Sequence, residues 1–218
     1  ECKVENLHCL LDSYSHKLGI GKSMSSFEKN EKRTILISGA SKGIGRSITE
    51  RLIREGHRIS IGVRNPDKLK ESLLEQNVSV GKRLLLTKYD SCCDSDAKTW
   101  VERSVKHFKG FDTIIHCAGI FKNTKLIYKD GEESTINDLI KTNLMGPWML
   151  TRHSWDQLCQ NNNSRIIVLV SMSGKRSKGN IAGYSVSKFA LMSLCQTIKN
   201  EGWKEGIRIT AICPGWVN

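Results

Sequence analysis

Residues 34–45 read TILISGASKGIG, a short apolar run that enters a glycine-rich turn directly. The first five residues are mostly aliphatic or β-branched, which predicts a buried strand. A helical pattern follows, because Ile44, Ile48, Leu52 and Ile53 fall on one stripe and a glycine at position 56 supplies a C-terminal stop. This segment is therefore predicted to fold as a strand, a glycine turn and a helix.

The glycine turn predicts a site for a phosphate group. It directs free backbone N–H groups and the N-terminus of a helix at whatever lies above it, and this arrangement suits a pyrophosphate. Its glycines, Gly39, Gly43 and Gly45, follow the spacing G-x-x-x-G-x-G rather than the common G-x-G-x-x-G fingerprint. A tight turn between a strand and a helix in any layered protein is the alternative interpretation.

A second motif, Gly183-Tyr184-Ser185-Val186-Ser187-Lys188, places a tyrosine and a lysine four residues apart. On a helix these side chains share a face, so the ammonium of Lys188 can lie near the phenol of Tyr184 and favour its ionised form. A free tyrosine titrates near pH 10. For the phenol to act as an acid or base near neutral pH, its phenolate must be stabilised by about 4 kcal/mol. A solvated surface pair is the alternative.

From residue 34 to its last residue, the chain resembles the short-chain dehydrogenase/reductase family in its common single-domain form. Residues 38–45 are similar to the family's glycine motif, with serine in place of the usual threonine. Asn143 and Ser171 lie in segments that resemble its asparagine and catalytic serine motifs, and Pro214-Gly215 resembles the motif after its sixth strand. The order of these motifs along the chain also resembles that of the family.

The resemblance implies a catalytic set of Asn143, Ser171, Tyr184 and Lys188. Ser171 would hydrogen-bond the substrate oxygen, and Tyr184 would exchange a proton with that oxygen. Lys188 would hold the nicotinamide ribose and lower the pKa of the phenol, while Asn143 would join Lys188 in a water-linked proton relay. Two alternatives remain for the serine, which are that Ser171 only caps the strand end and that Ser173 is the closer hydroxyl.

The implied function is the interconversion of a small-molecule carbonyl and an alcohol by hydride transfer. A catalytically silent NADP(H)-binding or redox-sensing protein on the same fold is the alternative from another class, because fold does not fix function. By the same resemblance, this chain looks like a fragment, and the full-length protein is expected to form a homo-oligomer. The sequence does not predict the substrate.

Arg64 predicts the choice of cofactor. It stands 25 residues after Gly39, at the end of the second predicted strand, where an acidic residue would bind the ribose 2′-hydroxyl of NAD. Together with Lys42 it suits a 2′-phosphate, so NADP(H) is expected in preference to NAD(H). A flanking surface arginine is the alternative. The predicted cofactor contacts are Gly39, Ser41, Lys42, Gly43, Ile44, Gly45, Arg64, Asp90, Ala118, Gly119, Tyr184, Lys188, Pro214 and Gly215.

Two of these positions need comment. By resemblance Asp90 contacts the adenine ring, and an N-terminal turn or cap is the alternative for it. Ala118 and Gly119 belong to His116-Cys117-Ala118-Gly119, where the family usually carries N-N-A-G. The family uses that segment mainly to hold the central sheet beside the cofactor, so activity is expected to survive while local stability is in doubt. A metal site at His116 and Cys117 would need further ligands, and none follows at suitable spacing.

The alternation of strand and helix patterns predicts an α/β fold, namely a Rossmann-type doubly wound parallel sheet with helices on both faces. Its 218 residues, 39% hydrophobic and 26% charged, suit a single domain. Strands are expected at residues 34–38, 58–63, 83–88, 112–116, 166–170 and 207–212. Further helices are expected at residues 66–76, 96–108, 134–159 and 183–202.

Composition argues against several other classes of protein. The eight cysteines are scattered without a C-x-x-C pair, which predicts reduced thiols and a cytoplasmic protein. No apolar run approaches the length of a membrane span. The net charge of +12 is spread along the chain without a nucleic-acid motif, so a basic surface that attracts an anionic cofactor or substrate is the preferred interpretation.

The two ends of the chain do not follow the family pattern. Residues 1–30 are predicted to be a non-conforming or disordered extension, ahead of a cofactor-binding catalytic domain at residues 31–218. By resemblance, the family continues after Pro214-Gly215 with a segment that covers the substrate and with a last strand. The last strand of the sheet is therefore expected to be missing.

Overall fold

The computed structural model describes residues 32–75 and 82–215, so the predicted extension at residues 1–30 lies outside the described residues. Within these ranges, six strands form one parallel sheet in the order β3-β2-β1-β4-β5-β6. This is the strand order of the doubly wound Rossmann fold, which confirms the predicted fold class. The strands are β1 (Thr34–Ser38), β2 (Arg58–Val63), β3 (Leu84–Lys88), β4 (Thr113–His116), β5 (Ser164–Leu169) and β6 (Ile207–Ile212).

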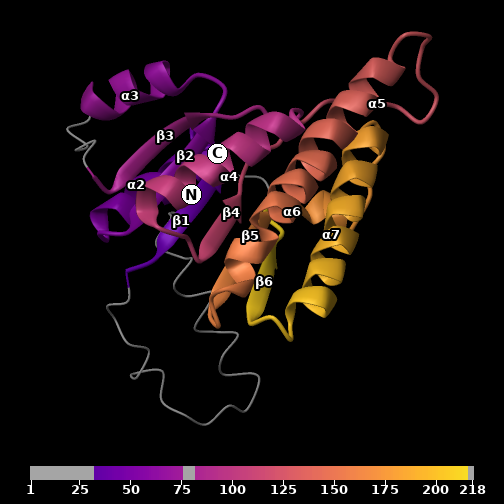
Figure 1. Ribbon diagram of the computed structural model, residues 1–218. Coiled ribbons are helices and arrows are strands. Elements are labelled where there is room, and N and C mark those ends of the chain that lie inside the picture. The colour runs from indigo at the N-terminus through magenta and orange to yellow at the C-terminus, as the bar shows by residue number, and fades with distance from the viewer. Residues whose placement is uncertain (1–31, 76–81, 216–218) are drawn as a thin grey trace. The chain divides into compact units, whose positions relative to one another are not determined.

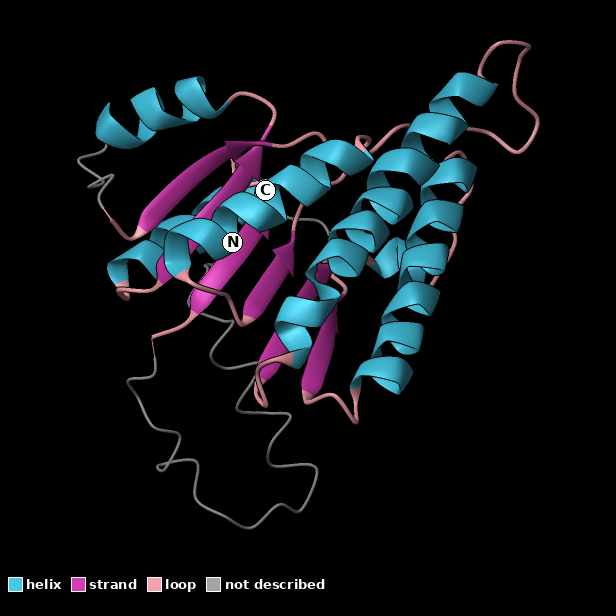
Figure 2. Ribbon diagram, viewed as in Figure 1, coloured by secondary structure: helices cyan, strands magenta, loops and turns pink. Residues whose placement is uncertain are grey.

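Helices connect the strands, and every predicted element within the described ranges is present with bounds that differ by at most two residues (Figure 2). The helices expected over residues 134–159 form α5 and α6, joined by a π-helical turn, η2. The helical elements are α2 (Gly43–Arg54), α3 (Pro66–Glu75), α4 (Asp94–Phe108), α5 (Glu133–Ile140), η2 (Lys141–Met145), α6 (Gly146–Cys159), η3 (Met172–Gly174) and α7 (Ala182–Gly202). Among the described residues, no helix is long and apolar enough to cross a bilayer.

The sheet is covered on both faces, so its central strands are apolar on both sides. Leu36 and Ile114 belong to the core cluster formed with α4, α6 and α7. Their neighbours in sequence, Ile35 and Ile115, belong to the cluster formed with α2 and α3, because successive strand residues point to opposite faces. Figure 1 shows α4, α6 and α7 across one face of the sheet.

One residue of the predicted apolar stripe in α2 departs from expectation. Ile48, Leu52 and Ile53 pack against the core, whereas Ile44 is exposed. The reason is position, because Ile44 lies in the first turn of α2, past the end of β1 where the sheet offers no surface to cover it.

All six strands are parallel, so their carboxyl ends meet at one edge of the sheet. The segments that follow these ends contain most of the residues that the sequence singled out. They include the glycine turn after β1, Arg64 after β2, Asp90 after β3, Cys117 to Gly119 after β4, Ser171 after β5 and Pro214 after β6.

A glycine in β2 is required by the indole that covers it. A Cβ atom on Gly62 would lie 2.6 Å from Cζ3 of Trp100, which is completely buried. The indole is fixed in place because its Nε1 donates a hydrogen bond to Oγ of Ser60 at 2.8 Å. The ring therefore has little freedom to move aside.

We expect Gly62→Ala to lower the free energy of unfolding by about 1–3 kcal/mol, the usual cost of overpacking a rigid core. Urea unfolding followed by circular dichroism would measure it. Gly179→Ala is the matched control, because no heavy atom lies within 4 Å of a Cβ at that position. Equal stability of the two variants would contradict the conclusion that the Trp100 indole requires glycine at position 62.

Candidate active site

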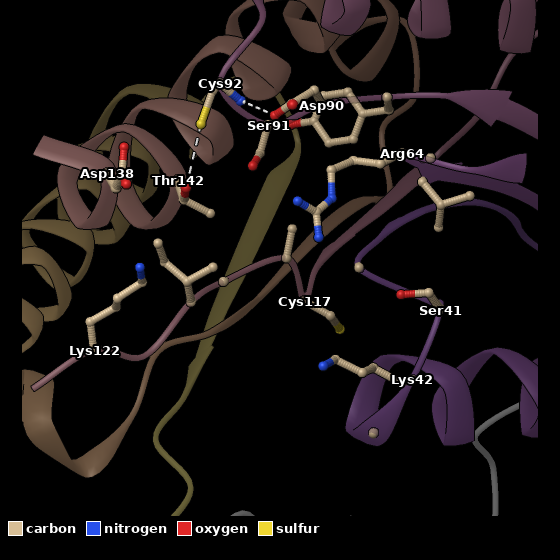
Figure 3. Close-up of a pocket in the computed structure, with 18 residues that line it drawn as sticks. Ser41, Lys42, Arg64, Asp90, Ser91, Cys92, Cys117, Lys122, Asp138 and Thr142 are labelled. Atoms are coloured by element: carbon tan, nitrogen blue, oxygen red, sulfur yellow. Dashed lines mark hydrogen bonds between the residues drawn. The ribbon is translucent and has the colours of Figure 1, made fainter. Parts of the chain in front are cut away.

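A cavity of about 650 Å³ opens at the carboxyl edge of the sheet (Figure 3). It is formed by the glycine turn, by the ends of β2 and β3 with the residues that follow them, by the loop after β4, and by Asp138 and Thr142. Eight of the predicted cofactor residues line it, namely Gly39, Ser41, Lys42, Gly43, Arg64, Asp90, Ala118 and Gly119. The other predicted cofactor residues, Ile44, Gly45, Tyr184, Lys188, Pro214 and Gly215, lie outside its lining.

The glycine turn is tightly packed at Gly39 and Gly45 and open at Gly43. A Cβ on Gly39 would lie 2.5 Å from the backbone nitrogen of Ala118, and a Cβ on Gly45 would overlap the carbonyl oxygen of Gly39. Gly43 has a φ of 59°, which favours glycine, and nothing lies within 4 Å of a Cβ there. The N-cap residue of α2, Lys42, makes no side-chain capping bond, so the first N–H groups of the helix are left for another acceptor, and Gly43 in its first turn lines the cavity. The turn thus fits a phosphate-bearing group.

Two cations face the same cavity. Lys42 and Arg64 are both exposed and both line it, and Figure 3 shows their cationic groups directed at the same hollow from different elements. Neither side chain forms an ion pair with another residue in the described part of the chain. Both charges are therefore free to meet an anionic ligand.

Asp90 has a local structural role and also faces the cavity. Its Oδ1 accepts a hydrogen bond from the backbone N–H of Cys92 at 2.9 Å, which is the geometry of an Asx turn. Its own N–H donates to Oδ2 of Asp96 at 3.0 Å. The turn role left open by the sequence is thus present, and the contact with adenine stays a prediction.

Lys188 is buried beside Tyr184. Its Nζ lies 5.8 Å from the centroid of the Tyr184 ring and donates a hydrogen bond to the carbonyl oxygen of Leu169 at 3.2 Å. Burial lowers the pKa of the Lys188 amine to about 8, so the amine still carries its proton at pH 7. A positive charge is therefore held close to the phenol ring.

Gly119 joins this pair to the cavity. A Cβ at Gly119 would lie 3.3 Å from Oδ1 of Asn143 and 3.5 Å from Nζ of Lys188. Because Gly119 also lines the cavity, the amide of Asn143 and the amine of Lys188 lie directly behind the cavity wall. A larger side chain at this position would separate them from it.

Asn143 connects three segments through its side chain. It is fully buried in η2, and its Oδ1 accepts a hydrogen bond from Ile120 N–H at 2.8 Å. Its Nδ2 donates to Ile120 O and to Ser187 Oγ, each at 3.0 Å. Ser187 in turn donates to the carbonyl oxygen of Tyr184 at 2.7 Å. The amide thus fixes the loop after β4 against α7, while the water-linked proton relay stays a prediction.

Ser171 follows β5, and its Oγ accepts a hydrogen bond from the backbone N–H of Ser173 at 3.0 Å. Ser171 thus caps the start of η3, the short helix after β5, rather than the end of the strand itself. Its hydroxyl proton has no acceptor among the described residues, so it remains available to a substrate oxygen. The choice between Ser171 and Ser173 as the substrate-binding hydroxyl stays open.

Thr124, which the sequence did not indicate, holds the first turn of α7. Its Oγ1 accepts from Gly183 N–H at 2.8 Å, its carbonyl oxygen accepts from Ala182 N–H at 2.8 Å, and its own N–H donates to Asn180 O at 3.0 Å. These contacts satisfy two of the N–H groups that a helix leaves unpaired at its start. The position of Tyr184, in the same turn, thus depends on a distant loop.

Phe121 lies on the same loop and contacts the ring of Tyr184. The two rings meet edge to face, with centroids 4.9 Å apart and planes at 79°. An alternating or helical pattern does not mark Phe121, because it belongs to a loop. Its contact with Tyr184 is therefore evident only in the folded structure.

The substituted segment at the end of β4 is uncharged at neutral pH. Nε2 of His116 lies 3.1 Å from Oγ1 of Thr151, and burial lowers the pKa of this imidazole to about 4. Burial likewise raises the pKa of the Cys117 thiol to about 12. Within the described ranges, no group of three or more His, Cys, Asp or Glu side chains could hold a metal ion.

The order of the sheet defines a Rossmann-type α/β protein, and the glycine turn at its carboxyl edge has a geometry that could hold a phosphate-bearing ligand. The profile described as "short chain dehydrogenase" matches residues 33–218. The protein therefore belongs to the short-chain dehydrogenase family.

Named relatives agree with this family. Agropine synthesis reductase of Rhizobium rhizogenes is 32% identical over 190 residues, which cover 87% of this chain and 43% of the relative. The 3-oxoacyl-[acyl-carrier-protein] reductase FabG of Escherichia coli K12 is 27% identical over 187 residues, 86% of this chain and 74% of the relative. The chain thus spans less than half of the first relative and about three quarters of the second.

A solved structure has the same fold. The alcohol dehydrogenase of the archaeon Thermococcus sibiricus, complexed with 5-hydroxy-NADP, superposes with a TM-score of 0.76 at 26% identity. The superposition covers 86% of this chain and 77% of the archaeal chain.

The buried His116 predicts sensitivity to acid. The pKa of this imidazole is about 4 in the folded chain against 6.5 for an ordinary histidine, so between these values the unfolded chain binds a proton that the folded chain does not. The free energy of unfolding should then fall by about 3 kcal/mol as the pH drops from 6.5 to 4. Urea unfolding at a series of pH values would measure this loss.

His116→Asn should lack most of this loss, because asparagine does not titrate. His107→Asn is the control, since His107 is exposed and its removal should leave the pH dependence as it is. An unchanged acid profile in His116→Asn would show that other groups cause the sensitivity.

Proposed function

We propose that this protein is an NADP(H)-dependent oxidoreductase that interconverts a carbonyl and an alcohol by hydride transfer, with Tyr184 as the proton donor and acceptor. The observation that carries the proposal is the buried ammonium of Lys188, 5.8 Å from the Tyr184 ring centroid. Lys188 also lies directly behind Gly119, at the wall of a cavity that fits a dinucleotide. These two observations support the proposed acid-base pair and the proposed cofactor site.

The residues present fit the cofactor at several points. The glycine turn would hold the pyrophosphate, and Arg64 with Lys42 would hold a 2′-phosphate. Asp90 would contact the adenine, and Lys188 would hold the ribose beside the nicotinamide. Ile44, Pro214 and Gly215 complete the proposed contacts. The bound cofactor would supply or accept the hydride. The similarity to an alcohol dehydrogenase complexed with 5-hydroxy-NADP supports the choice of cofactor.

The chain's own groups would move the proton. In reduction, Ser171 donates a hydrogen bond to the carbonyl oxygen, and Tyr184 transfers its phenolic proton to the same atom. Lys188 stabilises the phenolate that remains. At roughly 6 Å and an effective dielectric constant of about 20, this charge is worth about 3 kcal/mol, most of the about 4 kcal/mol that a phenol needs near neutral pH.

A second candidate is a protein that binds NADP(H) without turnover. The observation in its favour is that Ser171, Tyr184 and Lys188 do not line the 650 Å³ cavity, which is formed by residues on the cofactor side. A turnover assay with a panel of ketones and aldehydes separates the two candidates, because only the first oxidises NADPH when substrate is added.

Tyr184→Phe should lower turnover by a factor of about 100 or more, since general acid catalysis contributes about 10²–10⁴-fold. Its affinity for NADPH should change little, whereas Lys188→Met should impair both turnover and binding. Stopped-flow or steady-state loss of NADPH absorbance, with a fluorescence titration for affinity, would measure these effects. Tyr128→Phe is the control, because it removes an exposed phenol. Normal turnover in Tyr184→Phe would reject the assignment.

Arg64→Asp should reverse the cofactor preference. The unmodified protein should bind NADPH more tightly than NADH, because Arg64 and Lys42 can both pair with the 2′-phosphate. The substitution should weaken NADPH binding by about tenfold or more, corresponding to about 1.4 kcal/mol. Arg103→Asp makes the same charge change at an exposed position of α4 outside the cavity lining and should keep the preference. Equal or tighter NADH binding by the unmodified protein would contradict this prediction.

A further inference from the structure

Two loops beside Tyr184 carry an excess of positive charge. We define the rim as residues 121–129, the first part of the loop between Ile120 and α5, and residues 172–181, between Ser171 and α7. Neither segment contains aspartate or glutamate, although Asp130 and Glu132 follow in the rest of the first loop. The rim contains six exposed cations, Lys122, Lys125, Lys129, Lys175, Arg176 and Lys178.

These cations are not neutralised within the described part of the chain. None of the six forms an ion pair or a side-chain hydrogen bond with a described residue. Elsewhere arginines and lysines do find carboxylates, as Arg46 does with Glu50 and Arg152 with Asp94. Counted with Asp130 and Glu132, the two loops hold six cations and two carboxylates, so the rim lies in a local excess of positive charge.

The two segments form one structural unit. Thr124 and Ile181 form a parallel bridge, and Thr124 also bonds to the backbone of Asn180, Ala182 and Gly183. The contact is buried, since Thr124 is only 5% exposed. The charges of both segments are consequently held together beside the first turn of α7.

The rim adjoins the proposed chemistry at several points. Residues 172–181 connect Ser171 to α7, and Tyr184 lies in the first turn of that helix. Residues 121–129 begin with Phe121, whose ring contacts that of Tyr184. Lys122 also lines the cavity, where Figure 3 shows its amine. A molecule whose oxygen reaches Tyr184 therefore lies next to the rim.

A surface with an excess of one sign of charge attracts ligands of the opposite sign and raises their association rates, by about 10–10³-fold where the charge lines a cleft. Resting on the proposed function, we infer that the substrate is an anionic carbonyl or alcohol, a small molecule with a carboxylate or phosphate group that the rim attracts. The rim also exposes Leu126 (81%) and Ile127 (84%), which would favour an uncharged apolar substrate instead. A matched pair of substrates separates these two cases.

The test compares an aliphatic ω-oxo carboxylate with its methyl ester, at saturating NADPH so that cofactor binding does not contribute. At about 0.01 M ionic strength we expect kcat/KM for the acid to exceed that for the ester by about tenfold or more. The difference should shrink at about 0.15 M, because the screening length falls from about 30 Å to about 8 Å.

A rim variant locates the effect. It combines Lys125→Gln, Lys175→Gln and Lys178→Gln. This variant should lose most of the kcat/KM advantage of the acid and keep kcat/KM for the ester. Lys122 is kept because it also lines the proposed cofactor cavity. The matched control is Lys106→Gln, Lys199→Gln and Lys204→Gln, which removes the same charge. Lys199, for example, lies about 25 Å along α7 from its first turn. The control should keep the advantage.

The outcomes are distinct. Equal kcat/KM for acid and ester, or an advantage that the rim variant keeps, overturns the inference and leaves the proposed function intact. If neither compound is reduced, the failure concerns the proposed function, and calorimetric binding of the acid to the NADPH complex decides the role of the rim. Binding that the rim variant loses and the control keeps supports the inference, and binding that both keep overturns it.

Discussion

The amide of Asn143 has no contact with solvent, and all three of its hydrogen bonds go to other segments of the chain. It fixes Ile120 in the loop after β4 and, through Ser187, the first turns of α7. Buried amides are costly to leave unpaired, so these bonds constrain each segment against the others. The wall of the cavity and the helix that carries Tyr184 and Lys188 are thereby both held by Asn143, and the geometry of the candidate site depends on it.

Much of this arrangement could be predicted from local patterns. The apolar run at residues 34–38, the glycine turn and the spacing of Tyr184 and Lys188 depend on neighbours within a few residues, and parallel strands bring their carboxyl ends together. The contacts of Thr124 and Phe121 with α7 could not be predicted, because they join residues about sixty positions apart through a loop without periodicity. Ile44 shows the opposite limit, where a regular stripe extends past the sheet that should cover it.

The charge of Lys188 favours the proposed chemistry but lowers the stability of the fold. Burial lowers the pKa of the Lys188 amine to about 8, so in the free protein its charge is held at a cost below that pH. The one protein acceptor bonded to its Nζ, within the described ranges, is the carbonyl oxygen of Leu169. Ligand hydroxyls would supply further acceptors, so the residue gains partners when the site is filled. A residue that destabilises the empty fold is expected where activity requires a poised charge.

Charge is also distributed differently on the two sides of Gly119. The cavity mixes signs, because Asp90 and Asp138 line it together with Lys42, Arg64 and Lys122, so its charges partly cancel at a distance and short-range pairing would select its ligand. The two loops of the rim hold six cations against the carboxylates of Asp130 and Glu132, so their net positive field extends about a screening length into solvent. Under the proposed function, close contacts at Arg64 would discriminate between cofactors, whereas the loops beside Tyr184 would attract the substrate over a distance. The cofactor would thus be recognised by short-range contacts and the substrate by long-range electrostatic attraction, in adjoining parts of one edge of the sheet.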